Sequence, residues 1–317
     1  MTAKHEKYRR LIEFCRELPP IPTAVAWPCD QSSLQGVVDA TREGLIAPIL
    51  VGQRERIEAL AAQHGIDIGG LPIEDAPYSQ AAAARAVELV REGKAEALMK
   101  GSLHTDELMG AVVKRETGLR TARRVSHCFV MDVPGHEEPL IITDAAVNIA
   151  PTLAEKMDIT QNAIDLAHAL LIGEQDEDVR VAILSATETV NPAVPSTVEA
   201  AALCKMADRG QITGAILDGP LALDNAISLE AAQIKRIDSP VAGRANVLVV
   251  PDLEAGNMLA KSLTFLAGAD CAGIVLGARV PIILTSRADS LLSRLASCAV
   301  AALMAKARRE STGKVIG

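Results

Sequence analysis

The chain has 317 residues, more than the roughly 250–300 at which one hydrophobic core stops growing, so two domains are expected. Hydrophobic residues make up 49% of the chain and aromatic residues only 2%, which suits helices packed on a buried parallel sheet and leaves little for base stacking or an aromatic ligand cage. The formal net charge of −8 argues against nucleic acid as a partner but permits a local basic cleft for a phosphate group.

Neither an export signal nor a membrane span is recognisable in the sequence. The N-terminal segment is charged and amphipathic, and no apolar run reaches the roughly 18 residues that a membrane helix needs. The six cysteines are scattered without a C-x-x-C pair, which is typical of small, reduced core residues. We therefore expect a cytoplasmic enzyme without a membrane partner.

From the start of the chain, short apolar runs alternate with amphipathic helical stretches, the pattern of a parallel sheet with crossover helices. A first helix is predicted at residues 4–18, where Tyr8, Leu11, Ile12 and Cys15 share one face. Strands are then predicted at 22–27, 47–52, 71–74 and 96–100, separated by helices at 33–43, 53–64 and 78–92.

The pattern changes at residues 127–143, which predict two antiparallel strands joined by a Pro-Gly turn. A helix at 152–172 and a second β/α array follow, with strands at 179–185, 213–217, 246–250 and 271–276, a last strand at 281–285 and a terminal helix at 289–308. The fold class is α/β: two three-layer domains with mostly parallel sheets flanking a cleft. We assign 1–145 with 275–317 to one domain and 146–274 to an inserted second domain.

Ligands of α/β proteins bind where strands end, and the last strand delivers Thr285, Ser286 and Arg287 to such an end. A guanidinium next to helix-terminal amides makes a site for a phosphate or an oxyanion. Asp289 has two interpretations, a nearby carboxylate for the chemistry or an N-cap of the terminal helix, which Ser290 also suits.

The segment PDLEAGNMLAK places Asn257 and Lys261 in a predicted helix at 254–266, at i and i+4 on one face. Both side chains are candidates for the crevice at the strand ends. The alternative is an ordinary strand-to-helix turn with a solvated lysine.

Two further segments carry polar residues past a strand end. Lys100, Gly101 and Ser102 follow a strand without P-loop spacing, and Thr105 or Asp106 suits the cap of the next helix. One interpretation is a small-residue turn that lets substrate approach the backbone, with Lys100, Gly101, Ser102 and Thr105 as candidate binding residues. The alternative is a bare turn.

In the segment ITDAAVNIAPTL, Asn148 precedes a helix start at Pro151 or Thr152. Asn148 is a candidate for hydrogen bonding to a ligand, or it ties down the crossover between the domains. The basic group Arg120, Arg123 and Arg124 suits the phosphates of a large anionic substrate or a solvated loop. The motifs H-E-x-x-H, G-x-S-x-G and G-x-G-x-x-G are absent, which argues against zinc proteases, α/β-hydrolases and standard dinucleotide-binding proteins.

The segments SPVAGRANVLVVPDLEAGNMLAKSL and GARVPIILTSRADS resemble the signature regions of the phosphate acetyltransferase and phosphate butyryltransferase family. KGSLHTDEL, DAAVNIAPTL and VRVAILSATETVNPAVPST extend the resemblance to roughly residues 15–310. It implies the exchange of coenzyme A and phosphate on an acyl group, without a bound cofactor or an active-site metal. It also implies a fold similar to isocitrate and isopropylmalate dehydrogenases, and a homodimer.

The resemblance assigns Ser286 and Arg287 to the family's Ser-Arg pair, which contacts the reacting acyl and phosphate groups. In the acetyltransferases a catalytic aspartate follows the serine by seven residues, and this chain has Ser293 there. The butyryltransferase branch carries S-R-A-D-S, as this chain does, which makes Asp289 the nearby carboxylate. Acetyl, propionyl and butyryl groups all remain candidate substrates.

Two other functions are weighed against this one. A metal- and NAD-dependent dehydrogenase of similar architecture needs an aspartate cluster, and the predicted cleft segments have none. A non-catalytic sensor of acyl-CoA or acyl phosphate fits the loss of the distal aspartate. We expect a stand-alone transferase that acts on small molecules, with coenzyme A as a co-substrate.

Overall fold

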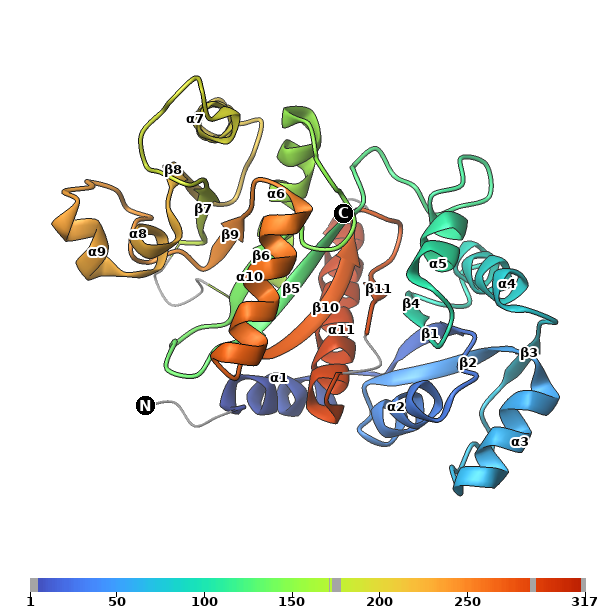
Figure 1. The fold of residues 1–317 in the computed structure, drawn as a ribbon. Coiled ribbons are helices and arrows are strands. Elements are labelled where there is room, and N and C mark those ends of the chain that lie inside the picture. Colours follow the sequence, from blue (N-terminus) through green and yellow to red (C-terminus); the bar gives the residue numbers. More distant parts are fainter. Residues whose placement is uncertain (1–4, 171, 173–177, 286–288, 315–317) are drawn as a thin grey trace. The chain divides into compact units, whose positions relative to one another are not determined.

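The computed structural model describes residues 5–170, 172, 178–285 and 289–314 (Figure 1). The chain divides into two compact units. The first unit consists of His5–Arg123 with Ala272–Gly317, and the second unit consists of Arg124–Cys271. The domain boundaries inferred from the sequence, at 145 and 275, remain a prediction.

The first unit contains the β/α array predicted for the start of the chain. Its strand order is β3-β2-β1-β4-β11-β10, and every pair is parallel except β10 with β11. Helix α11 packs against α1 and α2, and α4 packs against α5 and β1 (Figure 1). The strands are β1 Ile21–Ala26, β2 Ile46–Gly52, β3 Ile73–Asp75, β4 Ala97–Lys100, β10 Asp270–Leu276 and β11 Ile282–Ile283; the helices are α1 Glu6–Arg16, α2 Gln31–Arg42, α3 Arg54–His64, α4 Ser79–Arg91, α5 Thr105–Val112 and α11 Leu291–Lys314.

The second unit has the strand order β5-β6-β9-β7-β8. The predicted antiparallel pair is confirmed, because β5 pairs with β6 through Cys128–Thr143 and Met131–Leu140, whereas the other strands are parallel. The strands are β5 Ser126–Asp132, β6 Leu140–Thr143, β7 Arg180–Leu184, β8 Ile216–Leu221 and β9 Val247–Val249; the helices are α6 Leu153–Ala169, α7 Pro195–Asp208, α8 Leu223–Ile227, α9 Leu229–Ile234 and α10 Leu253–Leu266.

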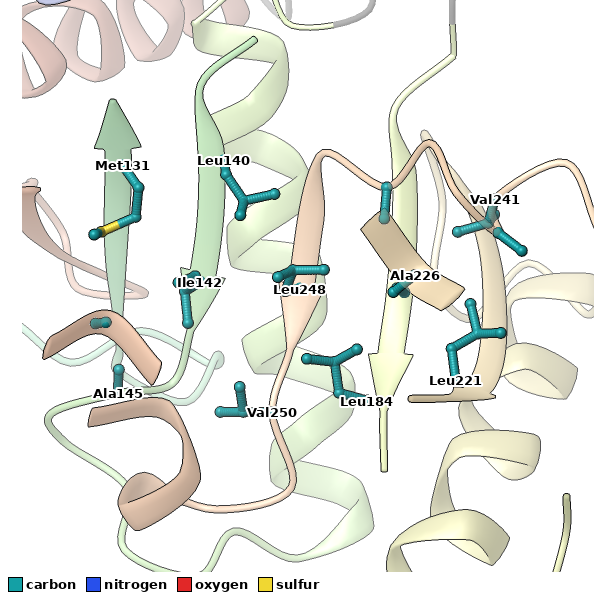
Figure 2. Close-up of a cluster of buried hydrophobic side chains, with 14 of the residues drawn as sticks. Met131, Leu140, Ile142, Ala145, Leu184, Leu221, Ala226, Val241, Leu248 and Val250 are labelled. Atoms are coloured by element: carbon teal, nitrogen blue, oxygen red, sulfur yellow. The ribbon is translucent and has the colours of Figure 1, made fainter. Parts of the chain in front are cut away.

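The core of the second unit gathers apolar side chains from neighbouring strands. Figure 2 shows Leu140 and Ile142 of β6, Leu248 of β9 and Leu184 of β7 around one buried cluster. Helix α10 packs Leu259 and Leu263 against this cluster, and its start is fixed by Asp252, whose Oδ1 accepts from the Ala255 N–H at 2.8 Å. The carboxyl ends of β6 and β9 are thus held next to the first turn of α10.

Candidate active site

The turn after β4 is held against the end of β1. Lys100 Nζ donates to the carbonyl oxygens of Gly101 and Leu103, at 3.1 and 3.2 Å. The Ser102 backbone N–H and hydroxyl both donate to the Trp27 carbonyl, at 2.8 and 2.9 Å. Trp27 has a φ of 56°, a left-handed conformation that bulky residues rarely adopt. Hydrogen bonds therefore fix the conformation of the predicted segment Lys100–Ser102 in the first unit.

Gly101 is required by the close approach of the two strand ends. Its N–H donates to the Ala26 carbonyl at 2.9 Å. A Cβ at this position would lie 2.5 Å from the carbonyl oxygens of both Ala26 and Trp27, closer than such atoms can approach. The backbone of Ala26 and Trp27 occupies the space that a side chain would need.

A small pocket, with a cavity volume of about 10 Å³, lies at these strand ends in the first unit. The first turn of α2 forms one side, and its N-cap Asp30 accepts from the Ser33 N–H at 2.7 Å. Lys100 and Arg294 bring two cationic side chains to the pocket. It is lined by Asp30, Ser32, Ser33, Gly36, Met99, Lys100, Gly101, Thr285 and Arg294. Cations, hydroxyls and the amino end of a helix together favour an anionic ligand.

Ser286 and Arg287 lie outside the described residues, and their assignment remains a prediction. Thr285, the residue before them, lines the pocket together with Lys100 and Gly101. Two segments that the sequence selected separately, the turn after β4 and the end of the last strand, therefore meet at one place.

The structure separates the two interpretations of Asp289. Ser290 caps helix α11, because its hydroxyl accepts from the Ser293 backbone N–H at 3.1 Å. Asp289 is therefore the residue before the cap. Its backbone carbonyl accepts from Arg294 Nη2 at 2.9 Å. Ser293, at the position of the acetyltransferase aspartate, is only 5% exposed and accepts a hydrogen bond from the Ser290 hydroxyl. A catalytic role of Asp289 remains a prediction.

Helix α5 starts one residue earlier than expected. Its N-cap is His104, whose backbone N–H donates to Glu107 Oε2 at 2.9 Å, so the expected cap at Thr105 or Asp106 is wrong. Thr105 is the first helical residue and is half-buried. Its predicted contact with substrate is untested.

In the second unit, the loop that follows β6 is organised around the Asp144 carboxylate. Asp144 is 3% exposed and accepts from the backbone N–H groups of Ala146, Val147 and Asn148, at 2.9, 3.0 and 3.2 Å. The Asn148 side-chain amide also donates to Asp144 Oδ2, at 2.5 Å. A buried carboxylate with this many donors fixes the loop conformation.

Asn148 is fully engaged inside the second unit. Its Nδ2 also donates to the Val125 carbonyl at 2.9 Å, and its Oδ1 accepts from Arg124 Nε at 2.7 Å. The Arg124 guanidinium is half exposed and pairs with Glu155 at 3.0 Å. Of the basic group noted in the sequence, Arg124 is therefore anchored, and Asn148 is the residue that anchors it.

Asn257 reaches the same loop from α10. Its Nδ2 donates to the Ala145 carbonyl at 3.2 Å, while Lys261, one turn further along the helix, is exposed. Gly256 permits the close approach, because a Cβ there would lie 2.8 Å from the Asp144 carbonyl oxygen. Asn257 thus binds the loop that contains Asn148, whereas Lys261 is exposed to solvent.

His127, on β5, is a buried titratable residue at the start of this region. It is 1% exposed, and its Nδ1 has no hydrogen-bond partner among the described residues. Burial lowers the pKa of His127 to about 4, and the negative charge of Asp144 opposes this shift. The imidazole is therefore neutral in the folded protein near pH 7.

We expect His127 to make the folded protein less stable as the pH falls. The folded pKa lies below the usual 6.5, so the unfolded chain binds a proton that the folded chain rejects. The free energy of unfolding should fall by about 2 kcal/mol from this group between pH 7 and pH 5. Urea titrations at both pH values should show a smaller difference for His127→Gln than for the wild type. His64→Gln, at an exposed position, is the control variant. If His127→Gln shows the same difference in unfolding free energy between the two pH values as the wild type, the assignment is contradicted.

The family described as Phosphate acetyl/butaryl transferase matches this chain over residues 78–302. A phosphate acetyltransferase of Rhizobium meliloti is 64% identical over 307 residues, which cover 97% of this chain and 96% of that protein. This chain belongs to the phosphate acetyl- and butyryltransferase family. A phosphate butyryltransferase of Clostridium acetobutylicum is 42% identical over 290 residues, covering 92% of this chain and 94% of that protein.

Solved structures of the family have the same fold. A branched-chain phosphotransacylase from Enterococcus faecalis V583 has a TM-score of 0.77 and 33% identity, with 89% of this chain and 98% of that chain covered. The resemblance and the α/β class with mostly parallel sheets, both predicted from the sequence, are confirmed.

In this member of the phosphate acetyl- and butyryltransferase family, three residues were not selected from the sequence: Asp30 and Arg294 at the pocket of the first unit, and His127 in the second unit. Asp30 carries a signal, since an aspartate directly before an amphipathic run is typical of an N-cap. Arg294 and His127 carry none, because the Arg294 guanidinium binds the Ser32 carbonyl, 262 residues away, and the charge that acts on His127 belongs to Asp144 in the loop after β6.

Proposed function

We propose that this chain transfers a short acyl group between coenzyme A and inorganic phosphate: acyl-CoA plus phosphate gives acyl phosphate plus CoA. The observation that carries the proposal is the 64% identity to a phosphate acetyltransferase over 97% of this chain. Coenzyme A is a co-substrate. The cationic pocket beside Thr285 supports an anionic substrate at this end of the first unit.

In this proposal, phosphate attacks the thioester carbonyl and an oxyanion develops. Arg287 binds the phosphate and Ser286 donates to the oxyanion. In the reverse direction, Asp289 assists loss of the proton from the CoA thiol, whose unperturbed pKa lies near ~8.5. The turn formed by Lys100, Gly101 and Ser102, together with Thr105, Asn257 and Lys261, contributes to binding, and Asn148 acts through Arg124.

Direct transfer in a ternary complex is supported by the state of five of the six cysteines. Burial raises the pKa of Cys15, Cys128, Cys204 and Cys298 to about 12 and that of Cys29 to about 11. These thiols are protonated near neutral pH and are poor nucleophiles. Binding both substrates side by side supplies a proximity effect of up to ~7–11 kcal/mol. Initial rates at varied acetyl-CoA and phosphate should give intersecting double-reciprocal lines, and parallel lines would indicate a covalent acyl-enzyme instead.

We propose acetyl as the preferred acyl group, because the 64% identical relative is named an acetyltransferase and the named butyryltransferase is 42% identical. The S-R-A-D-S segment and Ser293 point the other way, toward the butyryl pattern. Values of kcat/KM for acetyl-, propionyl- and butyryl-CoA at fixed phosphate decide between them. A higher kcat/KM for butyryl-CoA would reject the acetyl assignment.

We propose that the protein is a homodimer in the cytoplasm and that an exposed apolar face of α10 contributes to the dimer. Met258, Phe265 and Leu266 are 62%, 79% and 86% exposed, more than a monomer usually leaves open on one helix. Among the described residues, no helix is long and apolar enough to cross a bilayer.

Phe265→Glu should shift the protein toward the monomer in light scattering coupled to gel filtration. A charge replaces an apolar contact in the proposed dimer interface, and we expect at least about a tenfold weaker association. Phe14→Glu, at a position of α1 that is 41% exposed, is the control and should leave the mass unchanged. A wild-type monomer, or a dimeric Phe265→Glu variant, contradicts this surface.

A further inference from the structure

Arg294 connects two parts of the first unit that are far apart in the sequence. It lies in the first turn of α11 and is half-buried. Its Nη1 donates to the Ser32 carbonyl in α2, and its Nη2 donates to the Asp289 carbonyl, both at 2.9 Å. One guanidinium thus fixes the Asp289 backbone relative to the amino end of α2. The planar guanidinium can donate these two hydrogen bonds at the same time, which a lysine cannot reproduce.

Gly36 provides an independent sign that this arrangement is specified. It lies in the middle of α2 and is buried, where glycine costs about 1 kcal/mol relative to alanine. A Cβ at Gly36 would lie 3.2 Å from Arg294 Cδ and 3.6 Å from Nη1. Because Gly36 has no side chain, the Arg294 side chain can pass over α2 at this position.

The arginine also lies at the pocket. Arg294 lines it together with Lys100, Thr285 and the α2 residues Ser32 and Ser33. Displacement of its guanidinium would therefore change both the charge at the pocket and the position of Asp289.

We propose that Arg294 is a positioning residue of the acyl-transfer site: it binds the carbonyls of Ser32 and Asp289 together and so holds Asp289, the carboxylate that follows the predicted Ser-Arg pair in the sequence, in place. The inference rests on the proposed function. It concerns orientation, so its loss should lower kcat more than it changes substrate binding. A displacement of about 1 Å in a reacting group is enough for a 100-fold loss of rate.

The first test is kinetic. Arg294→Met should lower kcat about 10- to 100-fold, and the rise in the KM for phosphate that follows from the lost charge at the pocket should be smaller than this fall in kcat. Arg294→Lys should recover little, whereas added guanidinium ion should partly restore Arg294→Met and methylammonium should not. Arg308→Met is the matched control, because Arg308 lies on the same helix and donates to the carbonyls of Ala278 and Arg279. Its kcat should equal that of the wild type.

The second variant, Gly36→Ala, guards against misfolding of Arg294→Met. Alanine favours the helix but pushes on the Arg294 side chain, so kcat should fall while the melting temperature is kept or raised. Hydrogen exchange measured by mass spectrometry should be faster in Arg294→Met for peptides containing Asp289 and unchanged in α3. An unchanged kcat in both Arg294→Met and Gly36→Ala, or unchanged exchange near Asp289, overturns the inference. A wild-type protein without acyl transfer overturns the proposed function instead, and the exchange measurement still decides whether Arg294 anchors Asp289.

Discussion

Replacement of Arg287 by alanine is expected to lower kcat about 100- to 1,000-fold and to raise the KM for phosphate. The guanidinium supplies the charge that binds phosphate before the attack and remains with it as the transition state forms. Removal of one such preorganised donor typically costs about 3–4 kcal/mol in the transition state. Steady-state rates of CoA release from acetyl-CoA, measured at several phosphate concentrations, give both parameters.

Arg309→Ala is the control for this substitution. Arg309 lies on α11 and forms an exposed ion pair with Glu96 at 2.6 Å, so its removal should change kcat by less than about twofold. Full activity of Arg287→Ala, or a loss no larger than that of Arg309→Ala, would show that the anion site does not lie in the segment that follows Thr285.

Gly101→Ala is expected to destabilise the protein by about 3 kcal/mol and to abolish most of the activity. The new methyl group would lie 2.5 Å from the carbonyl oxygens of Ala26 and Trp27, which are backbone atoms and cannot rotate away. The turn after β4 must therefore move, and Lys100 moves with it. Urea unfolding followed by circular dichroism measures the first effect, and the CoA-release assay measures the second.

Gly110→Ala provides a matched comparison within the same segment. Gly110 lies in α5 and is exposed, and a Cβ at this position would have no atom of the described residues within 4 Å. Alanine there should stabilise the protein by about 0.5–1 kcal/mol, because it favours the helix. Equal stability of the Gly101→Ala and Gly110→Ala variants would show that the approach of β4 to β1 is looser than the structure indicates.

The β/α alternation is predictable because each strand and helix is defined by its own local pattern. The helix predicted at 254–266 is α10, Leu253–Leu266, and the Pro-Gly turn correctly marks the antiparallel pair β5 and β6. The last strand is harder to predict. Residues 281–285 read as a strand of five, but β11 contains only Ile282 and Ile283 and pairs antiparallel to β10. Strand length and direction depend on partners distant in the sequence, which periodicity does not contain.

Short helices also escape the sequence pattern. The strand predicted at 213–217 is β8, Ile216–Leu221, and α8 and α9 follow it within Leu223–Ile234. Helices of five and six residues are too short to show an amphipathic repeat. They form because Ala226 and Ala232 pack into the core of the second unit (Figure 2 labels Ala226).

The sequence predicts that site residues lie at strand ends, but it does not predict which residues they bind. The sequence left Asn148 between a ligand contact and a structural role. In the structure its amide and carbonyl are used by Asp144, Val125 and Arg124. Arg294 shows the same limit in reverse, because an arginine in the first turn of a helix looks like a solvated residue. Only the fold brings it to the Ser32 carbonyl.

The central claim is acyl exchange between CoA and phosphate, and the most direct test is a simultaneous measurement of both products. Purified wild-type protein is incubated with acetyl-CoA, phosphate and EDTA; free thiol is titrated, and acetyl phosphate is followed by phosphorus NMR. We predict that CoA and acetyl phosphate form in a one-to-one ratio, only when phosphate is present, and that EDTA has no effect. Release of CoA without acetyl phosphate, or no release at all, would contradict this assignment.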